Sequence, residues 1–80
     1  MGERIYGFHA IEEALKKAGM GSTIYLQRNG GERIQSLERQ AQLTGKVAVK
    51  KVSKDELARM MPGVDLRGAL LDLGGPRRGA

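Results

Sequence analysis

The sequence predicts a small α/β domain, a three-layer sandwich built around a four-stranded sheet that is mostly parallel or mixed. The first observation is alternation, because short runs of strand formers are followed by stretches whose apolar residues recur every three or four positions. The second is size, since 80 residues are enough for about one hydrophobic core. The third is a hydrophobic content of 40%, which is ordinary for a folded chain. Such an alternation places helices over the faces of a sheet.

The composition excludes several kinds of functional site. The chain has no cysteine and one histidine, which excludes disulfides, thiolate metal sites, cysteine nucleophiles and histidine-rich metal sites. With two tyrosines, one phenylalanine and no tryptophan, the core must be aliphatic. No apolar run reaches the ~18 residues of a membrane span, and the acidic start Met1-Gly2-Glu3 does not resemble a secretory signal. We therefore expect a cytoplasmic protein with no membrane partner.

The charge balance indicates the class of partner. Fourteen lysines and arginines against nine acidic residues give a formal charge of +5. A small body with this excess favours a polyanion, such as RNA or DNA, or an anionic surface. Charge alone does not choose among these partners.

The first strand–helix pair occupies residues 5–18. Ile5-Tyr6 predicts a short strand that ends at the turn residue Gly7. A helix follows and ends at Gly19, since glycine is the usual residue just beyond a helix C-terminus. Its apolar residues share one face: Phe8, Ile11, Ala14 or Leu15, and Ala18. This face is expected to be buried.

The second pair occupies residues 23–43. Residues 23–27 are nearly all apolar or strand-forming, which predicts a central strand covered on both faces. Residues 28–31 turn the chain into a helix over residues 32–43, which Gly45 ends. The apolar face of this helix consists of Ile34, Leu37 and Ala41.

The third pair leads to the last strand. Residues 46–52 predict a more exposed, more basic strand, and Ser53 and Glu56 have the spacing of a capping box at a helix start. The helix covers residues 57–61 and ends at Pro62-Gly63. Residues 69–73 predict the fourth strand. Residues 74–80 offer no core side chains and predict a flexible tail or a truncated linker.

The segment Ile5-Tyr6-Gly7-Phe8-His9-Ala10-Ile11-Glu12-Glu13-Ala14-Leu15 carries a family resemblance. It resembles the start of the N-terminal substrate-binding domain of SpoU-type RNA 2′-O-ribose methyltransferases, whose motif reads Tyr-Gly-x-His-Ala-aliphatic-x-x-Ala-Leu. The arrangement of the remaining elements is compatible with that domain over residues 4–73. The family fold in turn resembles the α/β domain of ribosomal and kink-turn RNA-binding proteins.

The resemblance implies a function for the chain. Residues 1–73 would recognise ribosomal or transfer RNA, and residues 74–80 would be the tail or the start of a linker to an absent catalytic domain. In these enzymes a separate C-terminal knotted domain binds S-adenosylmethionine and transfers the methyl group. We therefore expect no catalytic, cofactor-binding or metal-binding residues in this chain. The expected partners are RNA, the methyltransferase domain and, for the full-length protein, a second copy.

One segment departs from the family pattern. The approach to the last strand usually reads His-Gln-Gly-aliphatic, whereas this chain has Leu66-Arg67-Gly68-Ala69. Only the glycine is kept. Arg67 is a candidate for a phosphate contact in place of the missing side chains.

The candidate RNA-binding residues follow from the predicted topology. If the first three strands are parallel, their C-terminal ends and the following helix N-termini lie at one edge of the sheet, where free amides and cations suit phosphate. Three segments meet there, residues 7–9, 28–33 and 51–54. The candidates are Gly7, His9, Arg28, Asn29, Gly30, Arg33, Lys51, Lys54 and Arg67.

Structural roles compete with these assignments. His9 could be satisfied locally at the helix start, Gly30 could be an ordinary loop residue, and Lys51 could protect an edge strand from aggregation. Tyr6 and Tyr25 could stack on unpaired bases, but we expect both in the core because the chain has few aromatic residues.

Two other functions compete with RNA recognition. The domain could be a protein-interaction module for dimerisation or for docking to the catalytic domain, provided that some of Met20, Met60 and Met61 are exposed. A free-standing enzyme is disfavoured, because His9 has no evident partner and the glycines form no nucleotide-binding motif.

Overall fold

The computed structural model describes residues 3–17 and 21–73, which form three helices and four strands. Each predicted strand and helix is present, with small differences at its ends. The predicted helix end at Gly19 and the predicted tail, residues 74–80, lie outside the described residues. In chain order the elements are β1 (Glu3–Tyr6), α1 (Phe8–Lys17), β2 (Ser22–Gln27), α2 (Glu32–Thr44), β3 (Val47–Val52), α3 (Lys54–Met60) and β4 (Ala69–Leu73).

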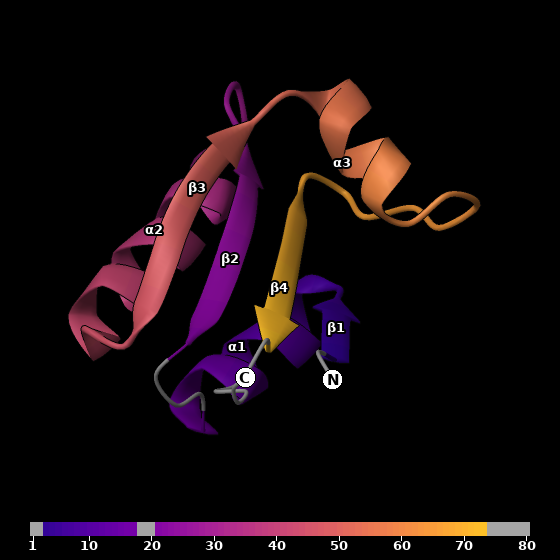
Figure 1. Ribbon diagram of the computed structural model, residues 1–80. Coiled ribbons are helices and arrows are strands. Elements are labelled where there is room, and N and C mark those ends of the chain that lie inside the picture. The colour runs from indigo at the N-terminus through magenta and orange to yellow at the C-terminus, as the bar shows by residue number, and fades with distance from the viewer. Residues whose placement is uncertain (1–2, 18–20, 74–80) are drawn as a thin grey trace.

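The four strands form one mixed sheet in the order β1-β4-β2-β3 (Figure 1). β2 and β3 are parallel, and β4 is antiparallel to both β1 and β2. β1, β2 and β3 therefore run in the same direction, as the predicted gathering of their C-terminal ends at one edge of the sheet required. The last strand is inserted between the first and the second, so its start lies at the edge where β2 and β3 end.

The register shows that the three parallel strands do not end at the same level. Tyr6, the last residue of β1, is level with Tyr25 of β2 and Lys50 of β3, through Leu70 of β4. β2 and β3 continue for two more residues, to Gln27 and Val52. At about 3.3 Å per residue, the end of β1 is set back by roughly 7 Å.

α1 and α2 cover one face of the sheet, and we call this the helical face. Their predicted apolar faces are the ones that pack, because Ile11 and Leu15 of α1 are buried, as are the inner residues of α2. The main hydrophobic cluster consists of Ile11, Leu15, Ile24, Leu26, Ile34, Leu37, Ala41, Val47, Ala69 and Leu71.

α3 covers part of the opposite face. Leu57 of α3 is buried in a second cluster with Val52, Leu66 and Leu70, and Tyr25 packs against it. The sheet therefore has helices on both faces, which is the predicted three-layer arrangement. Tyr6 differs from the prediction, because 47% of it is exposed. It lies on β1, an edge strand that has a neighbouring strand on one side only.

Local sequence explains where α2 and α3 begin and end. Gly45 has a φ of 69°, the left-handed conformation that ends α2, and its N–H bonds to the Gln42 carbonyl. The Ser53 hydroxyl accepts the Glu56 amide at 3.2 Å while the Glu56 carboxylate accepts the Ser53 amide at 3.4 Å. Both predicted signals are confirmed. No helix in residues 3–17 and 21–73 has the length and apolar content to span a membrane.

Candidate RNA interface

Three segments that are distant in sequence meet at one edge of the sheet, where β2 and β3 end and β4 begins. The Arg28 amide donates to the Val52 carbonyl at 3.0 Å, and the Gln27 amide donates to the Gly68 carbonyl at 2.9 Å. These two bonds join the β2–α2 loop, the start of α3 and the loop before β4. We call the polar residues of this edge the basic rim: Arg28, Asn29, Arg33, Lys54 and Arg67.

The β2–α2 loop is shaped by two glycines with different surroundings. A Cβ on Gly30 would lie 2.3 Å from Cγ1 of Ile34, so this loop position must be glycine for α2 to pack against it. Gly31 has open space around it, and it begins α2 with no side-chain cap. Gly30 thus serves packing within the loop, while Gly31 leaves the first amides of α2 without a side-chain acceptor.

Arg28 and Asn29 are exposed in this loop. Among the described residues, the Arg28 side chain has no hydrogen bond or ion pair. Its guanidinium is therefore available to an external anion.

The set-back segment Gly7–His9 is joined to the basic rim through an arginine. The Arg33 guanidinium lies over the Phe8 ring, 5.4 Å from its centroid, which is within cation–π range. Gly7 has a φ of 93°, and His9 is exposed beside it. The predicted residues of α1 and α2 are thus brought together, but below the level at which β2 and β3 end.

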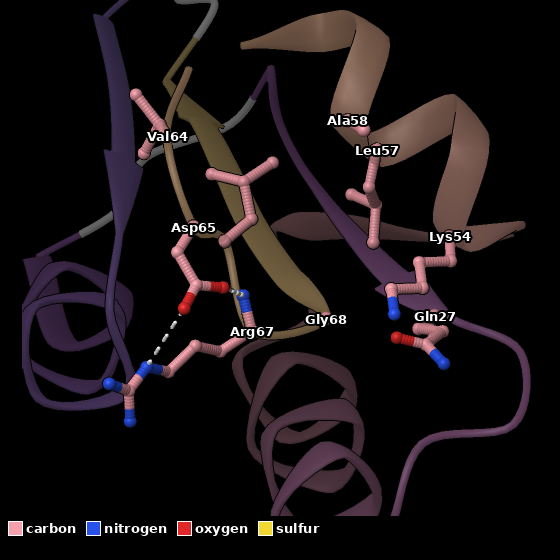
Figure 2. Close-up of a pocket in the computed structure, with 9 residues that line it drawn as sticks. Gln27, Lys54, Leu57, Ala58, Val64, Asp65, Arg67 and Gly68 are labelled. Atoms are coloured by element: carbon pink, nitrogen blue, oxygen red, sulfur yellow. Dashed lines mark hydrogen bonds and ion pairs between the residues drawn. The ribbon is translucent and has the colours of Figure 1, made fainter. Parts of the chain in front are cut away.

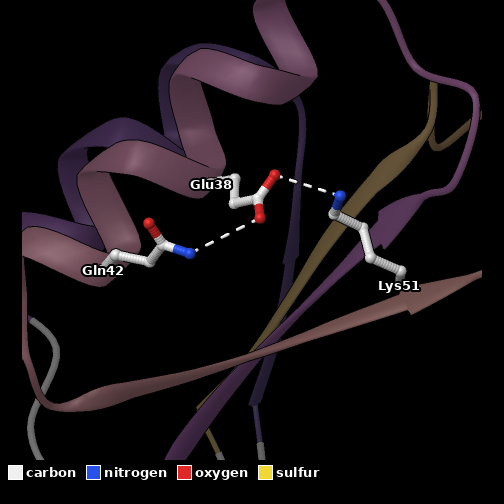
Figure 3. A network of polar contacts seen from close by, with 3 residues as sticks. All are labelled: Glu38, Gln42 and Lys51. Atoms are coloured by element: carbon white, nitrogen blue, oxygen red, sulfur yellow. Dashed lines mark hydrogen bonds and ion pairs between the residues drawn. The ribbon is translucent and has the colours of Figure 1, made fainter.

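Lys51 lies apart from the rest of the predicted site. Its side chain is on the helical face, where its ammonium pairs with the Glu38 carboxylate of α2 at 3.1 Å (Figure 3). Gln42 donates to the other oxygen of the same carboxylate at 3.5 Å. Side chains alternate along β3, so Lys51 and its neighbour Val52 lie on opposite faces of the sheet. Val52 packs with Leu57 of α3, and Lys51 is therefore directed away from α3 and from Lys54. The exposed Lys54 has no ion pair among the described residues.

Leu66 and Arg67, where the sequence departs from the family pattern, lie in a turn. Arg67 has a φ of 54°, a left-handed conformation, and Gly68 follows at 88°. Asp65 supports the turn, because its carboxylate accepts the Arg67 amide at 3.2 Å and lies 3.7 Å from Nε of the same residue. Both side chains are more than two-thirds exposed, so this ion pair is weak and the guanidinium remains accessible.

Acidic side chains also lie along this edge. Glu32 lies in the first turn of α2, and Asp55 and Glu56 lie in the first turn of α3. Asp65 lies in the loop before β4, where it pairs with Arg67. The edge is therefore not a continuous basic surface. Its cations stand at separate points, which suits a few defined phosphate contacts.

A cavity of about 340 Å³ opens at the same edge, between α3 and the loop before β4 (Figure 2). Two predicted residues, Lys54 and Arg67, line it. Sequence reasoning missed Gln27, which lines it as well. Strand alternation was the available signal, since it places Gln27 on the same face as Tyr25 and hence toward α3. No group of three or more metal-ligating side chains occurs in residues 3–17 and 21–73.

The comparisons with known proteins identify the family. Residues 4–65 match the family model for RNA 2′-O ribose methyltransferase substrate binding, which is more than half of the 80 residues. The match ends just before the departure at Leu66-Arg67. A search of curated proteins finds no significant match. The chain therefore belongs to the family of SpoU-type RNA 2′-O-ribose methyltransferase substrate-binding domains, as the resemblance of residues 5–15 predicted.

Proposed function

We propose that the basic rim is the surface with which this domain binds its RNA substrate, and that the substrate is ribosomal or transfer RNA. One observation carries the proposal: the fold gathers Arg28, Lys54 and Arg67 from three separate segments at one edge of the sheet. Arg33 extends this edge toward Gly7 and His9. Forked guanidinium donors match phosphate oxygens, and a lysine adds a point charge.

The arrangement of these residues favours recognition of shape and of loops. The major groove of an A-form helix is too narrow for side chains, so proteins contact its backbone and read unpaired nucleotides. The uncapped N-terminus of α2 adds backbone amides beside Arg33, and the dipole of a helix favours an anion at that end.

Methyl transfer belongs to another part of the enzyme in this proposal. The chemistry would come from a C-terminal domain that binds S-adenosylmethionine. The chain would act in the cytoplasm as the recognition module of that enzyme, which would dimerise at full length.

An NMR titration with a ribosomal RNA hairpin and a transfer RNA tests the proposal. We expect chemical-shift changes at Arg28, Arg33, Lys54 and Arg67 that diminish with added salt. The double variant Arg28→Ala, Arg33→Ala should lose about tenfold in affinity, since each phosphate contact to arginine is a charged hydrogen bond. The control is Lys16→Ala, Lys17→Ala, which removes the same charge from the last turn of α1. Equal affinity of the two double variants would contradict the proposal.

The alternative of a protein-interaction module receives less support. Met60 and Met61 pack against the second cluster and are partly buried, and Met20 lies outside the described residues. A salt-independent shift pattern around Tyr6 and Leu43, the exposed large apolar residues of the described part, would favour this function instead.

A further inference from the structure

We propose that the cavity beside α3 is a binding pocket for a single unpaired RNA base, extruded from the substrate next to the basic rim. The proposal rests on the proposed function, because it names what the same edge recognises besides phosphate. Three observations carry it: a cavity with both apolar and polar walls, a side-chain amide with no hydrogen bond among the described residues, and the presence of Lys54 and Arg67 in the lining.

The cavity has the size and the walls that a planar ring requires. Its volume of about 340 Å³ is at the lower end of the roughly 300–1,000 Å³ of small-molecule sites. Leu57 and Leu66, 2% and 5% exposed, and the half-buried Val64 give it apolar walls. Gly68 contributes backbone alone, which keeps that wall flat. Aliphatic walls of this kind can contact the face of a base.

Gln27 supplies a polar group at the end of this apolar surface. It is the last residue of β2 and half-buried, and its side-chain amide makes no hydrogen bond to any described residue. The amide offers one carbonyl acceptor and two N–H donors side by side. This pattern matches the adjacent donor and acceptor on the edge of a base. The pocket can therefore read a base by hydrogen bonding as well as by shape.

Lys54 of α3 and Arg67 of the loop before β4 both line the cavity. Figure 2 shows the Lys54 ammonium directed toward Gln27 on one side, while the Arg67 guanidinium extends outward beside Asp65 on the other. An extruded nucleotide carries a phosphate on each side of its sugar. Lys54 can bind one of these phosphates while the base enters the cavity.

The chemistry of the lining separates a base from a lone phosphate. Phosphate requires several donors around it, whereas this lining includes the apolar side chains of Leu57 and Leu66 and the carboxylate of Asp65, which repels an anion. A base within an intact duplex cannot enter the cavity, because it is stacked and paired. The ligand is therefore an unpaired nucleotide from a loop or a bulge.

The first experiment titrates the chain with the four nucleoside 5′-monophosphates, with ribose 5-phosphate as the control that lacks a base. We expect the nucleotides to shift the Gln27 side-chain amide and the methyl signals of Leu57 and Leu66. Ribose 5-phosphate should shift only the signals of Lys54 and Arg67. Identical shift patterns for both kinds of probe, or no shift at Gln27, would overturn the pocket.

The second experiment compares a hairpin RNA containing one bulged nucleotide with the same hairpin fully paired. Gln27→Met keeps the side-chain length and removes the amide, and it should weaken binding of the bulged hairpin about tenfold. Ala58→Phe fills the cavity from an exposed position of α3 and should have the same selective effect. Gln40→Met makes the same chemical change in the C-terminal half of α2 and should leave both affinities unchanged.

The two proposals fail in different ways. Arg28 lies outside the cavity, so Arg28→Ala should weaken binding of both hairpins if the basic rim binds RNA. Suppose that Arg28→Ala weakens binding of both hairpins, while Gln27→Met and Ala58→Phe still bind the bulged hairpin more tightly than the paired one. The base pocket is then overturned, and the basic rim remains supported. If neither hairpin binds, the rim proposal fails, and the mononucleotide titration alone decides the pocket.

Discussion

Gly30 shows how a single residue positions the site. Ile34 lies so close to this glycine that any side chain would displace it, and Ile34 belongs to the main hydrophobic cluster. The glycine therefore fixes how α2 meets the end of β2. Its N–H also donates to the Gln27 carbonyl at 3.2 Å, which closes the turn that presents Arg28 and Asn29.

Substituting Gly30 tests this interpretation. Gly30→Ala should lower the free energy of unfolding by about 1–3 kcal/mol, because the added methyl overpacks the site. Urea denaturation measures the change. Gly31→Ala is the matched control: nothing lies within 4 Å of its Cβ position, and a poorer helix cap offsets a stiffer unfolded chain. An equal loss in both variants would show that loop flexibility, and not packing, makes glycine necessary.

Lys51 and Lys54 are three residues apart and should respond differently to substitution. Lys51 already pairs with Glu38, whereas Lys54 is unpaired at the basic rim. Lys54→Ala should weaken RNA binding several-fold, and Lys51→Ala should do so by less than about twofold. Fluorescence anisotropy with a labelled RNA hairpin measures both. A larger effect at Lys51 would move the interface to the helical face.

Residue-scale prediction succeeded where the chemistry is local. Gly45 and the Ser53–Glu56 pair act within a few residues, so their roles follow from sequence spacing. Prediction failed for Tyr6, because its exposure depends on β1 being an edge strand. The pairing of Lys51 with Glu38 joins two elements and has no signal in the sequence of either.

At the scale of the element, α3 depends on its first residues more than on its length. It has seven residues, too few for a stable isolated helix, and only Leu57 is buried within it. The capping box at Ser53 and the packing of Leu57 therefore both stabilise this helix. Arg4 adds a contact at the other end, where its guanidinium donates to the Met60 carbonyl at 2.7 Å.

Removing the cap should loosen α3 and the wall of the cavity together. Ser53→Ala should lower the free energy of unfolding by about 1 kcal/mol, because the Glu56 amide loses its acceptor. Glu56→Gln keeps the reciprocal bond available and serves as the control. Urea denaturation measures the change in the free energy of unfolding, and amide hydrogen exchange shows whether the loss of stability is confined to residues 54–60. Unchanged exchange rates in Ser53→Ala would mean that packing alone holds the helix.

The elements themselves were predictable because their periodicity reflects burial on one face. The inner residues of α2, Ile34, Leu37 and Ala41, are the three buried residues of that helix. The direction and place of β4 were not predictable, since they depend on pairings across the whole chain. That insertion brings Arg67 and Gly68 beside Gln27, and so it creates the cavity that the sequence did not reveal.

At the scale of the whole molecule, the distribution of charge sets how RNA binding depends on salt. The formal charge is +5, yet acidic residues are interspersed among the cations of the basic rim. Few phosphates are therefore neutralised at once. This contrasts with a continuous basic surface, for which affinity falls very steeply as salt rises.

The slope of log affinity against log salt concentration should accordingly be shallow, about −3 to −4. Arg28→Ala and Lys54→Ala should each reduce the magnitude of this slope by about one. Lys17→Ala, at the far end of α1, should leave it unchanged. Titrations at three or more salt concentrations measure these slopes. An unchanged slope in both rim variants would show that the phosphates are bound elsewhere.

The inserted strand also determines how the domain yields to mechanical force. Glu3 pairs with Leu73, so the described chain begins and ends at the edge of the sheet opposite the basic rim. Tension applied through these two positions pulls the antiparallel strands β1 and β4 apart from one end, and the four residue pairs between them open one after another. Such peeling needs little force, whereas shearing a sheet would load all its bonds together. β1 would detach first, while β2, β3 and β4 kept Arg28, Lys54 and Arg67 in place.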